Sequence, residues 1–84
     1  MPIRVAWKKP QPAPYGRSRK KVMVHAAIVK DNTDRFLLYQ GPRTPIPTMW
    51  TLWDQEKDVQ HFLYGDGLKD AKSKAAERIR SVLA

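Results

Sequence analysis

The chain of 84 residues contains no cysteine and only two histidines, His25 and His61. Disulfides and thiolate zinc sites are therefore excluded, and two histidines are too few for a histidine-rich metal site. A chain of this length buries a smaller share of its surface than a larger domain does, so its fold must depend on an apolar core, on a partner, or on both. The absence of cysteine fits a reducing compartment. We expect a cytoplasmic protein, with an organellar matrix as the other intracellular location.

Long apolar runs are also absent. The longest, residues 22–29, includes His25 and is far shorter than the about 20 residues that a membrane-spanning helix needs. Two lysines and a proline at residues 8–10 occupy the positions where a secretory signal would be apolar. Four prolines within residues 1–21 disfavour the amphipathic helix of a mitochondrial presequence. We therefore expect no membrane partner.

Acidic residues are missing from residues 1–21, which hold seven of the sixteen basic residues. This segment therefore carries +7 of the formal net charge of +8, and residues 22–84 are close to neutral. Its prolines favour an extended, polyproline-like path. We divide the chain into a basic, proline-rich N-terminal arm (1–21) and a globular domain (22–84).

A basic N-terminal arm is typical of phosphate contact, which supplies affinity through counterion release with little sequence preference. Aromatic rings suited to base stacking alternate with the cations of this arm. The candidate nucleic-acid-binding residues of the arm are Arg4, Trp7, Lys8, Lys9, Tyr15, Arg17, Arg19, Lys20 and Lys21. Two alternatives remain open at this point: the arm is a solubilising tail, or Trp7 packs onto its own domain.

The pattern after the arm predicts two β-hairpins. Residues 22–29 form a nearly continuous β-branched run, and residues 35–39 follow a strong turn signal, which together predict the first hairpin. Residues 49–53 and 59–64, separated by a charged turn, predict the second. The proline-rich residues 41–47 between them cannot continue a strand ladder.

Residues 68–83 predict an amphipathic helix. Apolar residues recur there at spacings of three and four, at Leu68, Ala71, Ala75, Ile79, Val82 and Leu83. Lys69 and Lys72 point outward and join the candidate nucleic-acid-binding residues. We therefore predict an α+β fold, in which a small antiparallel sheet of three to four strands packs one C-terminal helix on one face, preceded by the extended basic arm.

The sequence shows no catalytic constellation, so we predict that the chain is not an enzyme and uses no cofactor and no metal. His25 lies in an apolar strand, where a core histidine is the simpler interpretation. Three acids of residues 54–58 lie in a turn that favours them, without a nucleophile beside them. Residues 65–67 lack the lysine and the further glycines of a nucleotide-binding loop.

The predicted third strand contains two tryptophans that are candidate binding residues. Trp50 and Trp53 point to opposite faces of a regular strand, so one is expected in the core and the other toward solvent or a partner. Aromatics on a sheet face stack on single-stranded bases, and they also form hot spots for protein contact. We assign Trp50 to the candidate binding residues. The alternative is that the arm or the helix covers both tryptophans, which would leave neither available for binding.

Three partial resemblances involve different segments. Residues 65–67 and 71–76 resemble the end of a double-stranded-RNA-binding domain, whose first helix and lysine doublet are missing here. The sheet and helix are similar in outline to the arm-binding domains of tyrosine integrases. Residues 25–39 and 50–52 resemble the opening hairpin of a Nudix domain. Residues 74–78 read Lys-Ala-Ala-Glu-Arg where that family has an arginine and its metal-binding glutamates, so the resemblance implies a degenerate version without hydrolytic activity. The three templates disagree, so the chain is assigned to no family.

Two hypotheses follow. The leading one is a small nucleic-acid-binding or ribonucleoprotein-associated protein that contacts the phosphates of RNA or DNA with its arm. The alternative is a small protein-binding module, such as an inhibitor or adaptor from a phage or mobile element, that uses a tryptophan-bearing sheet face or an exposed strand edge. Nucleic-acid binding should weaken steeply with salt, whereas protein binding should depend on the sheet aromatics. The sequence leaves the oligomeric state open.

Overall fold

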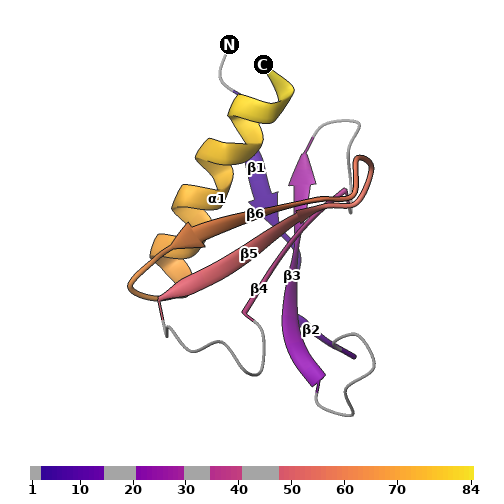
Figure 1. Cartoon of the computed structure of the whole chain (residues 1–84), viewed down its shortest axis with the longest axis vertical. Coiled ribbons are helices and arrows are strands. Elements are labelled where there is room, and N and C mark those ends of the chain that lie inside the picture. Colours follow the sequence, from indigo (N-terminus) through magenta and orange to yellow (C-terminus); the bar gives the residue numbers. More distant parts are fainter. Residues whose placement is uncertain (1–2, 15–20, 30–34, 41–47) are drawn as a thin grey trace.

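The structure is a computed structural model, and it describes residues 3–14, 21–29, 35–40 and 48–84. Within them, one C-terminal helix covers one face of an antiparallel sheet (Figure 1). The predicted α+β class and the position of the helix are thereby confirmed. The sheet has six strands, and the elements are β1 (Val5–Trp7), β2 (Gln11–Pro14), β3 (Lys21–Val29), β4 (Phe36–Tyr39), β5 (Met49–Asp54), β6 (Val59–Tyr64) and α1 (Leu68–Leu83).

The prediction of three to four strands was too low, because β1 and β2 of the arm join the four strands of the two predicted hairpins. β1 pairs with the second half of β3, with Val5 opposite Val29, and β2 pairs with the first half, with Gln11 opposite Val24. The prolines of the arm predicted an extended path, and no strand-pairing partner was assigned to it. A strand at a sheet edge tolerates them, because their missing N–H groups face away from the ladder. Residues 5–7 and 11–14 of the arm are therefore extended and form part of the sheet.

The strand order is β1–β3–β4–β5–β6, with β2 also on β3, so the arm forms one edge and β6 forms the other. Rows of paired residues cross this sheet, and successive rows lie on opposite faces. One row consists of His25, Leu38, Leu52 and His61, and its leucines belong to the core beneath α1. The next row consists of Ala26, Leu37, Trp53 and Gln60, and it lies on the face without the helix.

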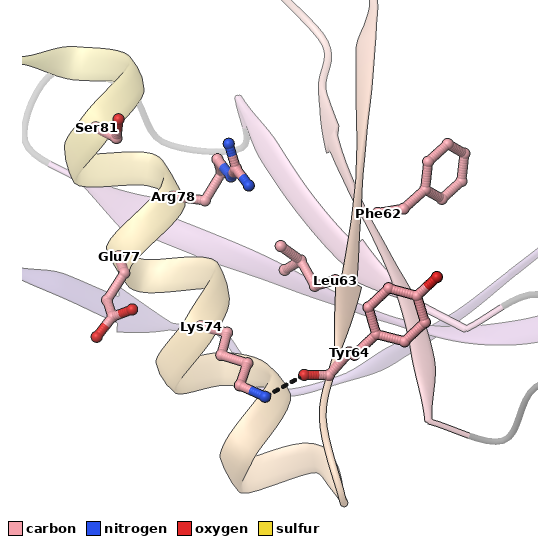
Figure 2. A pocket seen from close by; sticks show the side chains of 7 residues that line it. All are labelled: Phe62, Leu63, Tyr64, Lys74, Glu77, Arg78 and Ser81. Carbon is pink, nitrogen blue, oxygen red and sulfur yellow. Dashed lines mark hydrogen bonds between the residues drawn. The ribbon is translucent and has the colours of Figure 1, made fainter.

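Small side chains allow α1 to approach the sheet closely. Ala71, Ala75 and Ile79 are fully buried against the sheet, and Leu63 points from β6 toward α1, as Figure 2 shows. A Cβ atom added at Gly65, where β6 leads into the helix, would lie 2.8 Å from the backbone nitrogen of Ala71. Only glycine fits such an approach, so this turn fixes how the helix leaves the strand.

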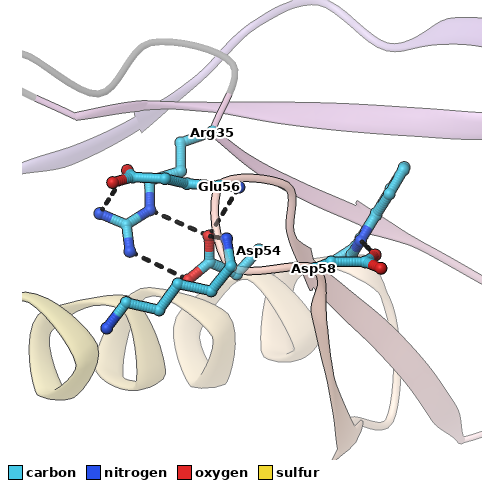
Figure 3. Close-up of polar contacts among 6 residues, drawn as sticks. Arg35, Asp54, Glu56 and Asp58 are labelled. Carbon is cyan, nitrogen blue, oxygen red and sulfur yellow. Dashed lines mark hydrogen bonds and ion pairs between the residues drawn. The ribbon is translucent and has the colours of Figure 1, made fainter.

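An ion pair ties Arg35, the residue before β4, to Asp54 at the end of β5 (Figure 3). The carboxylate of Asp54 is 1% exposed, and Arg35 donates to it twice, from Nε at 2.9 Å and from Nη2 at 3.0 Å. The same carboxylate accepts the backbone N–H of Glu56 at 3.1 Å. The hydrogen bond from Arg35 is the main cause that lowers the pKa of Asp54 below its ordinary value. The buried carboxylate of Asp54 is thus partnered by the residue that precedes β4 and by the turn that follows β5.

Asp54→Asn should lower the free energy of unfolding by about 3–5 kcal/mol, because the largely buried charge of Arg35 would then keep only the exposed carboxylate of Glu56 as an ion-pair partner. Glu56→Gln removes the exposed partner of the same guanidinium and should cost at most about 1 kcal/mol. Urea denaturation at pH 7 measures both variants, and equal losses would contradict a special role for the buried carboxylate.

The same ion pair predicts a dependence on pH. The pKa of Asp54 is lower in the folded than in the unfolded protein, so the stabilisation is present at neutral pH and is lost as pH falls below about 4.

Candidate nucleic-acid interface

Aromatic side chains gather on the face of the sheet that α1 leaves uncovered. Phe62 and Tyr64 of β6 are 57% and 56% exposed, and both point away from the helix (Figure 2). Trp53 of β5 lies on the same face through its pairing with Leu37 and Gln60. In the described part of the chain, α1 is the one helix and it covers the other face of the sheet, so these rings remain accessible.

Apolar residues of the other strands continue this surface. We call it the open face, and by register its members are Ile28, Leu37, Met49, Trp53, Phe62 and Tyr64. Ile28 is 40% exposed, and Leu37, Met49 and Trp53 are half-buried. Contiguous apolar surface on a small protein marks an interaction site more often than scattered exposed residues do.

The indole of Trp53 is held at its edge. Its Nε1 donates to Oδ1 of Asp58 at 3.1 Å, across the turn that joins β5 to β6. Asp58 itself has a positive φ of 52°, a conformation that aspartate tolerates better than most residues. The turn therefore restrains the ring while leaving its face on the open side of the sheet.

A cavity of about 300 Å³ lies where the arm passes along β3. Its lining includes Lys8 and Lys9 from the arm and Ala26 and Leu37 from the sheet. The backbone N–H of Lys8 donates to the carbonyl of Ala26 at 2.9 Å, which fixes the arm at this point. Ala26 and Leu37 share a row with Trp53, so the lysines and that ring are separated by three strand spacings, roughly 14 Å.

The other predicted residues of the arm have separate positions. Arg4 is exposed before β1, and Lys21 is exposed at the start of β3. Trp7 is half-buried and packs against the core, with Nζ of Lys72 5.9 Å from the centroid of its ring. Trp7 therefore packs onto its own domain, which was the alternative to a role in base stacking. Four candidates, Tyr15, Arg17, Arg19 and Lys20, lie outside the described residues.

The helix residues and one tryptophan lie on the opposite side of the sheet. Lys69 and Lys72 belong to α1 and are not brought together with the lysines of the arm cavity. Trp50 packs against the core, and it is Trp53 that faces the open side. The sequence alone could have identified Trp53 as the outward tryptophan. Strand residues two positions apart share a face, so Trp50 lies on the same side as the apolar Leu52. The same alternation around Leu63 places Phe62 and Tyr64 outward, although neither was among the predicted binding residues.

Contacts with α1 hold the first described residues in place. Nε of Arg80 donates to the carbonyl of Ile3 at 2.8 Å, and Ile3 and Val5 pack against the core. Together with the contact between Lys72 and Trp7, these interactions bind the start of the arm to the helix. The lysines that follow are consequently presented at a fixed place beside the open face.

His25 is the buried histidine of the helix face. Its exposed fraction is 5%, and its Nδ1 has no hydrogen-bond partner among the residues that the structure describes. Burial, and after it the positive charge of Lys72, lower the pKa of His25 below its ordinary value. The imidazole is therefore neutral at pH 7 and packs as part of the core.

No protein-family model matches the chain, and neither the curated proteins nor the solved structures contain a match. Over the described ranges, no three acidic, histidine or cysteine side chains gather as metal ligands. No helix in that part of the chain is long and apolar enough to cross a membrane. The function is therefore inferred from the geometry of the open face and the arm.

The free energy of unfolding should decrease as pH falls below about 6.5, because His25 binds a proton more readily in the unfolded than in the folded state. In the His25→Gln variant this decrease between pH 6.5 and 5 should become smaller. Denaturation in urea at a series of pH values measures the slope. An identical slope in the variant and the natural protein would contradict the assignment.

Proposed function

We propose that the chain binds single-stranded nucleic acid across the open face. Bases stack on Trp53, Phe62 and Tyr64, and Lys8 and Lys9 neutralise phosphates. The observation that supports this proposal is the exposure of aromatic rings on a helix-free sheet face, beside a cavity lined by two lysines. Stacking platforms flanked by cations are the usual design of proteins that bind single strands.

The geometry favours single strands over duplexes. Rings that lie on a sheet face can stack only on bases that are themselves unstacked and unpaired. Each such interaction contributes about 1–3 kcal/mol and accepts any base, because every base has a π-face. The bond between Trp53 and Asp58 restrains one ring before binding, which reduces the entropy lost on association.

Charge supplies the second contribution. The formal net charge of +8 lies mostly in the arm, and the described part of the arm passes along the sheet next to the open face. A strand that crosses from Trp53 toward the arm would reach Lys8 and Lys9 after roughly 14 Å, about two nucleotide steps. Backbone neutralisation there requires no particular base sequence.

Fluorescence anisotropy of labelled single-stranded RNA, single-stranded DNA and duplex DNA tests the proposal across a salt series. Phe62→Ala and Trp53→Leu should each weaken binding of single strands about 5- to 150-fold, the equivalent of one base–aromatic stack. Replacing Lys8 and Lys9 by glutamine should reduce the slope of log affinity against log salt by roughly 1.4, at about 0.7 for each phosphate that is no longer neutralised.

A matched control is available on the helix. Replacing Lys69 and Lys72 by glutamine removes the same charge from the opposite side of the sheet, and it should leave most of the affinity in place. Equal effects of the two lysine pairs would mean that only net charge matters. If circular dichroism shows that the aromatic variants are folded, and they bind single strands as tightly as the unmodified protein, stacking on the open face is contradicted.

A further inference from the structure

Among the described residues, β6 pairs with no strand on its outer side, so it presents a backbone edge. The N–H of Gly65 donates to the carbonyl of Thr48 at 2.8 Å, which makes these two residues a hydrogen-bonded pair of the ladder with β5. Pairs that exchange hydrogen bonds alternate with pairs that do not along an antiparallel ladder. The N–H and C=O groups of Gln60, Phe62 and Tyr64 therefore point away from the sheet.

A contact from the helix supports the outward direction of the Tyr64 carbonyl. The ammonium of Lys74 binds the carbonyl oxygen of Tyr64 (Figure 2), which requires that oxygen to face outward from β6. Gln60 and Phe62 offer further N–H and C=O groups along the same edge. β6 contains no proline, lysine or bulge, which are the devices that usually protect an edge from strand pairing.

The edge faces a groove of about 500 Å³ between β6 and α1. Lys74, Glu77 and Arg78 line its helix side, and Figure 2 shows the two cations directed toward β6 and the carboxylate of Glu77 directed away. Lys74 also pairs with Asp70 at 3.4 Å, whereas Arg78 has no ion pair within the described part of the chain. The groove therefore combines an open strand edge with positive charge.

We propose that this groove binds an extended acidic peptide segment of a partner protein. The peptide adds to β6 as a further strand, and its carboxylates lie near Lys74 and Arg78. Alternating N–H and C=O groups are complementary to another peptide backbone, which a nucleic acid does not offer. A second copy of this chain fits poorly, because each copy carries a net charge of +8 and β6 has no acidic residue.

A labelled heptapeptide of alternating valine and glutamate tests the proposal by fluorescence anisotropy. The matched peptide with lysine in place of glutamate should bind at least about tenfold more weakly. Arg78→Glu should weaken binding of the glutamate peptide by a similar factor, whereas Glu77→Gln should leave it nearly unchanged. If the glutamate peptide does not bind, or binds no better than the lysine peptide, the proposal is wrong.

Strand addition itself has a separate test. Gln60→Pro removes an N–H group from the outward edge without removing one from the ladder with β5, and it should weaken peptide binding about tenfold. Peptides that are N-methylated on one or the other alternate set of residues test the same point without changing the protein. One methylated set should bind and the other should not. Equal binding of both sets would exclude strand addition.

Sedimentation of the protein alone tests whether a second copy of the chain occupies the edge of β6. A monomer is the expected result. A dimer that Gln60→Pro dissociates would assign the edge to a second copy and overturn the proposal. These measurements use no nucleic acid, so they stand or fall independently of binding at the open face.

Discussion

The ion pair between Arg35 and the buried carboxylate of Asp54 fixes the register on which the open face depends. Asp54 lies opposite Phe36 on β4 and opposite Val59 on β6, so its position sets the alignment of three strands. A slip of one residue in a sheet exchanges its two faces. Such a slip would turn Trp53 toward α1. A buried pair at the end of β5 therefore determines which tryptophan is available to a ligand.

The uneven covering of the sheet is the second constraint. Ala71, Ala75 and Ile79 allow α1 to lie close to one face, and the chain has no second helix within the described residues to cover the other. Leaving Phe62 and Tyr64 more than half exposed forgoes the stabilisation that burial would give, about 25 cal/mol for each Å² of apolar surface. A small domain has little stability to spare, so exposed rings of this size are consistent with a function in binding.

Much of the fold could be predicted from residue patterns, and the exceptions have physical reasons. The spacing of Ala71, Ala75 and Ile79 defines a helix face in sequence, and the short apolar runs of both hairpins, bounded by turn residues, are equally local signals. The pairing of the arm could not be predicted, because proline is a signal against strands and its tolerance depends on lying at an edge. Whether a strand is central or at an edge is a property of the whole sheet.

The candidate site shows the same division between local and long-range information. Alternate residues of β5 share a face, so Trp50 lies on the side of Leu52, and this could be predicted from the sequence. The packing of Trp7 under Lys72 required α1 to lie beside β1, which no local pattern encodes. The cavity with Lys8 and Lys9 likewise exists only because the arm pairs with β3. Charge counting identified these lysines but could not separate them from those of the helix.

β6 connects the two proposed ligands without making them competitors. Phe62 directs its ring to the open face and its backbone groups to the free edge, so each ligand would use a different part of one residue. A strand added to β6 would extend the sheet beside Phe62 and Tyr64 and would leave their rings accessible. Removing the ring at position 62 should therefore impair stacking alone, whereas blocking the neighbouring N–H of Gln60 should impair strand addition alone. Two sites that share an element but not the same atoms can be occupied together, and an acidic peptide at this edge would lie on the side of the sheet farthest from the basic arm.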